Sequence, residues 1–215
     1  MKQNWEISFE YHLDRFRKID PEEASRRTGI LFYPEKSCFT FNVFGFPLIA
    51  EWPEFKLSIA DVSKEDSPGV HLLYPYNTLC SFQMQVLTMR VLTEGVSAPQ
   101  TGNFKAYREL PWGDVYDHNF SGRCIKRFAY SFGFKPEIFE KTAQAINGIK
   151  LTLGDVSYEF DFLGGIKCRF VLWKPDDEFP PSAQILFSDN AVLMYNAEDL
   201  AVAGDVIITA LKEMS

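Results

Sequence analysis

The sequence predicts an α+β fold made of two βββα halves, with antiparallel or mixed sheets and a helical insertion between them. Two separate regions, 30–60 and 157–187, have the residue alternation typical of β-strands. A helical pattern follows each of these regions, and further helical patterns lie at the N-terminus and in the middle of the chain. The 215 residues, 46% of them hydrophobic and 15% aromatic, suffice for one large or two small cores.

Two helices are expected before the first strands. The first is amphipathic, because apolar residues recur at i, i+4, i+7, i+8 and i+11, namely Trp5, Phe9, His12, Leu13 and Phe16. For the second, Asp20 is the expected N-cap, Pro21 the first helical residue and Gly29 the terminator.

The first β region reads as a three-stranded meander. Strand patterns cover 38–44, 46–52 and 55–59, with a turn at Gly45 and a break at Pro53. A polar loop is expected over Asp61–Gly69. Asn77 then caps a predicted helix that runs to about Leu92.

The middle of the chain is mainly helical. After a brief alternation over Phe104–Leu110, apolar residues repeat every four positions, at Tyr116, Phe120, Cys124, Phe128 and Phe132. A further helix is predicted over Pro136–Asn147, with Gly148 as its C-terminal stop.

The final third repeats the pattern of the first β region. Strands are predicted over 157–162, 166–173 and 183–187, and Asn196 caps a last helix that carries Leu200, Ala203, Ile207 and Leu211. Landmarks correspond at a nearly fixed offset: Gly45 with Gly165, Trp52 with Trp173, Asp61 with Asp189, and Tyr76-Asn77 with Tyr195-Asn196. An internal duplication explains this correspondence, and chance similarity of two simple meanders is the alternative.

We therefore expect a single compact domain over 1–215. Its expected parts are N-terminal helices (1–29), a first βββα half (30–93), a helical insertion (94–148) and a second βββα half (149–215).

Composition argues against several classes of protein. A formal net charge of −7 does not suit an extended nucleic-acid surface or an anionic membrane. Its basic clusters fall at helical spacing, which favours solvated helix faces: Arg15, Arg17 and Lys18; Arg26 and Arg27; Arg123, Lys126 and Arg127. Without a signal-peptide pattern or a long apolar segment, we expect a cytoplasmic protein that binds neither nucleic acid nor membrane.

The residues that bind metals or act as nucleophiles are scattered. Cys38, Cys80, Cys124 and Cys168 lack zinc-site spacing, which predicts buried, reduced thiols without disulfide bonds. The phosphate-binding, dinucleotide-binding, metalloprotease and serine-hydrolase motifs are missing. The three histidines, His12, His71 and His118, sit in unrelated contexts that favour ordinary polar or half-buried roles.

Two short stretches remain as candidate sites. The first holds Asp176, Asp177 and Glu178 between Trp173 and two prolines, and it is either a loop that binds Mg²⁺ or Ca²⁺ or a polar hairpin tip. We assign no metal to it. The second is Tyr107-Arg108-Glu109 followed by Trp112, where Arg108 could clamp an anionic ligand.

A structural ion pair is the preferred role for Arg108. We expect it within about 4 Å of a carboxylate of Asp176, Asp177, Glu178, Glu198 or Asp199. Its replacement by Ala would cost about 3–5 kcal/mol if that pair is buried and less than about 1 kcal/mol if it is exposed.

Three segments resemble the family called domain of unknown function 3786, which is found largely in anaerobic bacteria and archaea. They are GNFKAYREL (102–110), WKPDDEFPPSAQILF (173–187) and EDLAV (198–202). The family name implies no activity. The resemblance implies a link to anaerobic one-carbon and corrinoid metabolism, where some relatives carry an additional cysteine-rich iron-sulfur segment. This sequence does not contain that segment, so no cysteine takes a ligand role from the resemblance.

These observations leave three hypotheses for the function. The first is a non-catalytic protein that binds a small ligand, or an accessory protein of anaerobic metabolism, with its site where the Arg108 stretch meets the acidic loop. The second is a metal-assisted hydrolase or lyase that uses paired carboxylates such as Asp177 and Glu198. The third is a protein-interaction module that exposes Trp112, Trp173 and Phe179. The sequence specifies neither the cofactor nor the oligomeric state.

Overall fold

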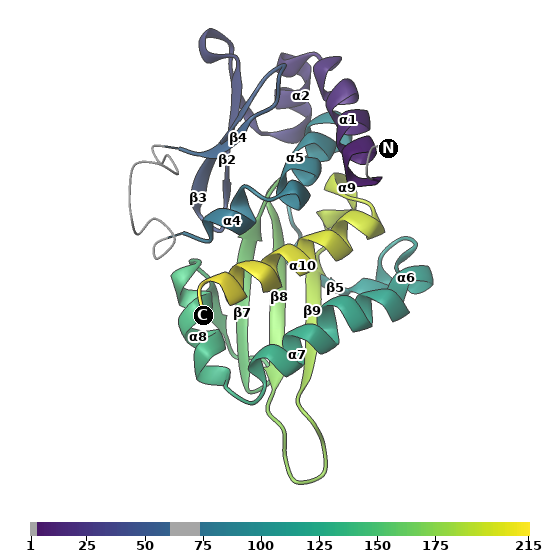
Figure 1. Ribbon diagram of the computed structural model, residues 1–215. Helices are drawn as coiled ribbons and strands as arrows, with labels where there is room; N and C mark the ends of the chain where they lie inside the picture. The colour runs from purple at the N-terminus through teal and green to yellow at the C-terminus, as the bar shows by residue number, and fades with distance from the viewer. Residues whose placement is uncertain (1–3, 61–73) are drawn as a thin grey trace.

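The protein has an α+β fold with two antiparallel sheets, as predicted, in a computed structural model that describes residues 4–60 and 74–215 (Figure 1). The first sheet has the strand order β1-β2-β3-β4, and the second has the order β5-β9-β8-β7-β6. The expected loop over Asp61–Gly69 lies outside the described residues, as does His71.

The helices before the first sheet follow from local signals. Helix α1 covers Asn4–Arg17 and α2 covers Pro21–Thr28. The Asp20 side chain accepts the backbone N–H groups of Glu22 and Glu23, and Gly29 ends the helix with a φ of 72°, so both predicted caps are confirmed.

The first sheet contains the three predicted strands and one more. The bounds are Leu31–Tyr33 for β1, Cys38–Val43 for β2, Phe46–Glu51 for β3 and Leu57–Ile59 for β4. A 3-10 turn, η1, joins β1 to β2 over Pro34–Lys36. The Gly45 turn registers β2 against β3 so that Phe39 and Val43 are buried, whereas β1 was missed because it has only three residues.

The helix predicted from Asn77 to Leu92 is in fact two helices. Helix α4 covers Tyr76–Leu79 and α5 covers Phe82–Glu94. Ser81, not Asn77, caps α5 through a hydrogen bond from the N–H of Met84. The Glu213 carboxylate instead accepts the backbone N–H groups of α4, and this partner far along the chain was not predictable from local sequence.

The middle segment forms one edge strand and a long interrupted helix. Strand β5 covers Phe104–Ala106, and the 3-10 turn η2 covers Tyr107–Glu109. Helix α6 (Gly113–Phe120), a π-helical segment η3 (Ser121–Lys126) and α7 (Arg127–Phe132) follow in direct succession. Helix α8 covers Pro136–Ala145.

Gly148, the predicted C-terminal stop of α8, lies three residues after the last helical residue, Ala145. Asn147 has the positive φ, 57°, and the N–H of Gly148 bonds to the carbonyl of Ala143. A Cβ atom at position 148 would lie 2.6 Å from the Phe160 ring, so glycine is required there by packing.

The second sheet contains the three strands predicted for the final third, flanked by short edge strands. Its bounds are Ile149–Leu151 for β6, Val156–Phe162 for β7, Ile166–Trp173 for β8 and Ser182–Ser188 for β9. Helix α9 covers Ala191–Met194 and α10 covers Ala197–Glu213, capped by Asn196 as predicted.

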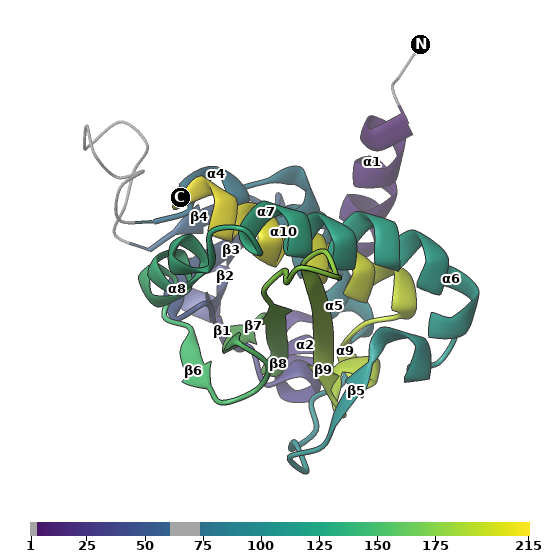
Figure 2. The same ribbon diagram turned by 90° about the horizontal axis from the view of Figure 1, so that it is seen from below.

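Helices α7 and α8 pack against the second sheet, and Figures 1 and 2 show α10 beside α7 across one of its faces. Helix α5 contacts α1, α2 and α10, so it joins the first half of the chain to the second. None of the helices in the described part of the chain is long and apolar enough to span a membrane.

The core is rich in phenylalanine, as the composition predicts. Rings of α7 and α8 meet rings of β7 and β8, and the chain of contacts includes Phe128, Phe139, Tyr158, Phe160 and Phe170. Phe44, at the tip of the β2–β3 hairpin, contacts Phe160 and Phe162 and thereby links the two sheets.

The two β regions share their strand order, and in the described residues each precedes a four-residue helix and a longer one. The matching of Asn77 with Asn196 fails in detail, because Asn77 lies inside α4 whereas Asn196 caps α10. The duplication and the division of the chain into four parts therefore stay predictions.

Candidate functional site

The acidic loop is a hairpin tip. Asp176, Asp177 and Glu178 join β8 to β9, and this hairpin projects from the molecule in Figure 1. The Asp176 carboxylate accepts the backbone N–H groups of Glu178 and Phe179 at 2.9 and 2.7 Å. Such a bond from an Asp side chain to its own turn is typical of a local turn, so the loop is explained without a ligand.

The predicted ion pair of Arg108 is wrong. Arg108 is exposed in η2, and it makes no ion pair within 4 Å of any of the five proposed carboxylates, all of which the structure describes. The strand pattern was misleading, because β5 ends at Ala106 and the chain then turns. Glu109 bonds back to the N–H of Ala106 at 2.7 Å, and Trp112 is 76% exposed.

Only some of the predicted site residues lie together. Tyr107, Glu198 and Asp199 line two adjoining pockets beside the N-terminal half of α10. Figure 1 shows that the β8–β9 hairpin, which carries Trp173 and the acidic tip, lies away from this end of α10. The residues outside both pockets are Arg108, Glu109, Trp112, Trp173, Asp176, Asp177 and Glu178.

The first of these pockets lies among α1, α5 and α10, and we call it the helix pocket. Its volume is about 290 Å³. One part of its wall is apolar and comes from Phe82, Val86, Leu87 and Val202. The other part is polar and contains Ser8, His12, Gln83, Arg90, Arg123, Glu198 and Asp199.

An ion pair between α5 and α10 forms the floor of the helix pocket. Nε of Arg90 lies 3.1 Å from Oδ2 of Asp199, and the two side chains are only 18% and 7% exposed. The Nε–H nevertheless has no hydrogen bond of acceptable direction. The two charges are close enough to attract one another, but the Nε–H does not point at the carboxylate, so this buried donor stays unsatisfied.

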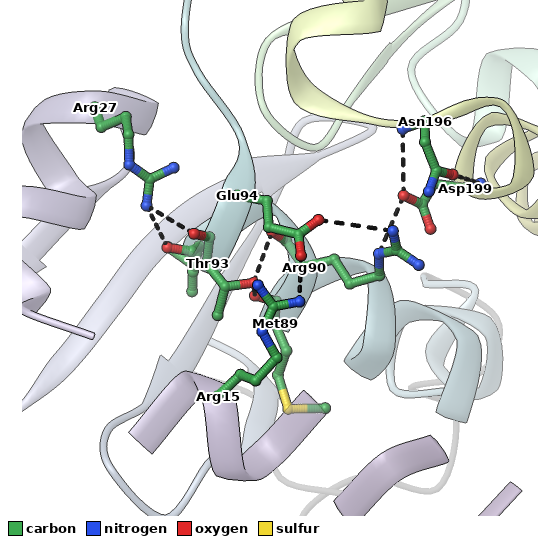
Figure 3. A network of polar contacts seen from close by, with 9 residues as sticks. Arg15, Arg27, Met89, Arg90, Thr93, Glu94, Asn196 and Asp199 are labelled. Carbon is green, nitrogen blue, oxygen red and sulfur yellow. Dashed lines mark hydrogen bonds and ion pairs between the residues drawn. The ribbon is translucent and has the colours of Figure 1, made fainter. Parts of the chain in front are cut away.

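The ion pair is part of a chain of alternating charges, shown in Figure 3. Arg90 also approaches Glu94 at 3.7 Å, and Glu94 in turn pairs with Arg15 of α1. Asp199 is held by a capping box with Asn196, in which each side chain accepts the other residue's backbone N–H. The charges of the pocket therefore have fixed positions.

Burial changes the proton affinity of two groups in the helix pocket. It raises the pKa of Asp199 to about 6, although Arg90 and the N–H of Asn196 oppose the rise. Burial also lowers the pKa of His12, and the neighbouring Arg90 and Arg15 lower it further. At neutral pH the pocket thus contains an uncharged imidazole and a carboxyl group that titrates near pH 6. Such shifted pairs in a concave site are typical of functional sites.

The second pocket, which we call the aromatic pocket, has a volume of about 260 Å³ and includes Tyr107, Tyr116, Asn119 and Phe120. The Tyr107 ring stacks on Phe120 with centroids 3.9 Å apart, and its hydroxyl donates to the Ala197 carbonyl at 2.8 Å. Arg123 and Glu198 line both pockets.

The sequence interpretation missed the residues at the centre of the helix pocket. The sequence pattern favours an ordinary polar role for His12 and a solvated helix face for Arg123, and it does not single out Arg90. A signal for His12 was present, because it lies on the apolar stripe of α1 with Phe9, Leu13 and Phe16. For Arg90 a comparable signal is its position on α5 between the buried Met89 and Val91.

A larger pocket, about 420 Å³, lies beside the C-terminal half of α10. Several of its charged groups bond to the protein itself. Glu213 accepts N–H groups of α4, and Arg127 pairs with Asp205 and donates to Thr209. These four side chains therefore have a structural role.

In the described ranges, 4–60 and 74–215, no three His, Cys, Asp or Glu side chains are grouped so that they could hold a metal ion. The four cysteines are free thiols. Burial raises the pKa of Cys124 to about 12, so this thiol stays protonated and unreactive at neutral pH.

A pH-dependent stability should reveal the buried Asp199. Its folded pKa is raised from 3.8 to about 6, so its contribution to stability is complete below pH 3.8 and is lost as the pH rises through 6. Urea unfolding should show that the free energy of unfolding of the wild type falls by about 3 kcal/mol relative to that of Asp199→Asn as the pH rises through this interval.

Glu159 provides the opposite control. Burial tends to raise its pKa, but hydrogen bonds and charges from Lys167 and Arg169 lower the pKa overall. The contribution of Glu159 to stability is present above its unfolded pKa and lost on acidification. The stability lost in Glu159→Gln should therefore be larger at high pH than at low pH. If the stabilities of the wild type and of Asp199→Asn instead changed in parallel with pH, this result would contradict the raised pKa of Asp199.

One family matches the chain. The family described as Domain of unknown function (DUF3786) matches residues 20–210. No curated protein and no solved structure matches. The matched range includes every strand in the described part of the chain, helix α5, most of α10, and the ion pair of Arg90 with Asp199, whereas α1 lies before it. Because it spans nearly the whole sequence, the chain belongs to the domain of unknown function family DUF3786.

Proposed function

We propose that this protein binds a small ligand in the helix pocket. The observation that carries the proposal is the Arg90–Asp199 pair, a buried charge pair with an unsatisfied donor and a raised carboxyl pKa on the floor of a pocket. Burying a carboxylate whose ionised form opposes folding has a stability cost, and proteins retain such groups where function needs them.

The dimensions of the pocket support the same proposal. Ligand pockets usually measure about 300–1,000 Å³ and combine apolar walls with a few polar groups. The helix pocket has about 290 Å³ and this mixed lining, so it suits a small molecule. The adjoining aromatic pocket extends the site at Arg123 and Glu198.

The proposal includes the setting in which the protein acts. The family resemblance supports a role in anaerobic metabolism, and four free cysteines suit a reducing compartment such as the cytoplasm. The sequence places the site where the Arg108 stretch meets the acidic loop. The site proposed here lies instead among α1, α5 and α10.

Acid–base catalysis is the second candidate. The suggested pairing of Asp177 with Glu198 is not supported, because one lies in the β8–β9 hairpin and the other at the start of α10. Glu198 and Asp199 are adjacent and differ in environment, since Glu198 is exposed and Asp199 is buried. Two carboxyl groups in different environments can serve as acid and base.

A protein-interaction surface made of Trp112, Trp173 and Phe179 has less support. Trp112 is 76% exposed at the start of α6 and Phe179 is 66% exposed in the β8–β9 hairpin. Figures 1 and 2 show these two elements apart, so the residues do not make one anchor.

Native mass spectrometry tests ligand binding directly. The chain would be purified from an anaerobic host as wild type, as Val86→Phe, which fills the apolar wall of the helix pocket, and as Val115→Phe. Val115 is 63% exposed on α6 and serves as the matched control. We expect an additional bound mass in the wild type and in Val115→Phe, and its loss from Val86→Phe.

Two results would contradict the proposal. One is a wild-type protein without any bound mass, and the other is a bound mass that persists in a folded Val86→Phe variant. Circular dichroism spectra of the three proteins would establish that each is folded.

A further inference from the structure

We propose that the ligand of the helix pocket is an α-amino acid with an apolar side chain, its ammonium group at Glu198 and its carboxylate at Arg123. This inference rests on the proposed function and specifies the class of molecule bound. It follows from which charged groups in the pocket already have partners and which do not.

The charges of Arg90 and Asp199 already neutralise one another, although the Nε–H of Arg90 has no aligned acceptor. Arg90 has two anionic neighbours, Asp199 at 3.1 Å and Glu94 at 3.7 Å, and Asp199 is 7% exposed and held by the backbone of Asn196. These groups form the rigid floor, and an incoming charge would have to displace an existing pair.

Glu198 is the anion left to a ligand. It is exposed, lines both pockets, and makes no hydrogen bond or ion pair with any residue in the described part of the chain. A carboxylate in this position is a natural partner for an ammonium group, which offers it up to three donors.

Arg123 is the cation left to a ligand. It also lines both pockets, and its side chain is 44% exposed. Its bond to Asp205 uses one terminal nitrogen at 3.1 Å, and Asp205 has a second cationic partner in Arg127. A guanidinium has five N–H donors, so Arg123 retains donors for a carboxylate.

The two groups are complementary to a zwitterion. Arg123 and Glu198 stand at the shared boundary of the two pockets, and neither forms an ion pair with the other within 4 Å. A simple anion would satisfy Arg123 but face the charge of Glu198, and a simple amine would do the reverse. A molecule that carries both an ammonium and a carboxylate satisfies each of them.

The apolar wall accounts for the rest of the ligand. Glu198 and Val202 are one helical turn apart on α10, and Phe82 and Val86 are one turn apart on α5. A side chain attached beside the ammonium group can therefore extend from Glu198 along Val202 toward α5. Branched aliphatic side chains suit this wall and its volume of about 290 Å³.

Isothermal titration with three related probes tests this assignment. The probes are L-leucine, 3-methylbutylamine, which lacks the carboxylate, and 4-methylpentanoate, which lacks the amine. Each charged contact supplies about one factor of ten in affinity or more. We therefore expect L-leucine to bind at least about tenfold more tightly than either of the other two.

Charge-neutralising variants assign the two contacts. Glu198→Gln should weaken L-leucine about tenfold and should not weaken 4-methylpentanoate, because it removes a like charge from that anion. Arg123→Gln should weaken L-leucine and should not weaken 3-methylbutylamine, for the same reason. Glu178→Gln, in the β8–β9 hairpin, and Arg108→Gln, in η2, are matched controls that should bind like the wild type.

The outcomes separate this inference from the proposed function. Equal affinity for L-leucine and one of its half-molecules, or unchanged binding in both variants, would overturn the amino-acid assignment. If none of the probes binds while a co-purified mass is still lost in Val86→Phe, the assignment fails and ligand binding in the helix pocket stands. If no such mass is found either, both fail.

Discussion

Replacing Arg90 by Met should destabilise the protein by about 3–5 kcal/mol at pH 8, where the variant leaves the Asp199 carboxylate buried without a countercharge. Met keeps the apolar stem of the side chain, so the change reports mainly on the charge. Because the pKa of Asp199 is already about 6, the variant can relieve this cost by taking up a proton. The destabilisation should therefore be much smaller at pH 5.

Urea unfolding at both pH values measures this effect. Arg108→Met is the matched control, because Arg108 is exposed and without an ion pair among the described residues. It should change the free energy of unfolding by less than about 1 kcal/mol at either pH. A cost for Arg90→Met that is the same at pH 5 and pH 8 would mean that Asp199 is not the group left unpaired.

Replacing Phe128 by Ala should cost about 3–5 kcal/mol at any pH, because it removes a fully buried ring and leaves a cavity. Phe128 is 0% exposed at the start of α7 and contacts Phe132, Phe139 and Phe170. Its neighbours belong to α7, α8 and β8, which cannot all move together to fill the space.

Phe134 offers the control for this prediction. It follows α7 in the chain and is 62% exposed, so Phe134→Ala should change the stability by less than about 1 kcal/mol. Thermal or urea unfolding of both variants compares them. Similar losses for the two rings would contradict the position of Phe128 in the core.

The long elements were predictable because their signals are local. Asp20, Pro21 and Gly29 define α2, and Asn196 defines the start of α10, through bonds within one helical turn. The edge strands β1 and β6 were missed, since three residues are too few to show a specific alternating pattern, whereas the alternation over Phe104–Leu110 includes β5. The single helix predicted from Asn77 to Leu92 is instead α4 and α5, because Glu213, whose carboxylate binds the N-terminus of α4, lies at the other end of the chain.

The sequence contains a signal for the π-helical segment. Apolar residues repeat every four positions from Tyr116 to Phe132, which drifts about 40° per step around an ideal α-helix. The π-helical segment Ser121–Lys126 widens the helix within this run, so Phe120, Cys124 and Phe128 are all buried. The same segment positions Arg123 at the pocket boundary.

The candidate site was only partly predictable. Tyr107, Glu198 and Asp199 were chosen from their residue types and do line the two pockets. Asp199 is one of five carboxylates predicted as partners of Arg108, but it pairs with Arg90, because pairing between residues so distant in the chain depends on the packing of α5 against α10. Clustered charge in the acidic loop indicated a hairpin tip and was not specific for a site.

The central claim, that the helix pocket is the ligand site, is tested most directly by the imidazole signals of His12 in a long-range ¹H–¹⁵N NMR spectrum. The small-molecule fraction released from natively purified protein would be added back to ligand-free protein. His12 lines the pocket and His118 is exposed on α6, so His118 serves as an internal reference. The account predicts that the His12 signals shift with saturation while those of His118 do not. Unchanged His12 signals, with bound ligand shown by mass spectrometry, would contradict it.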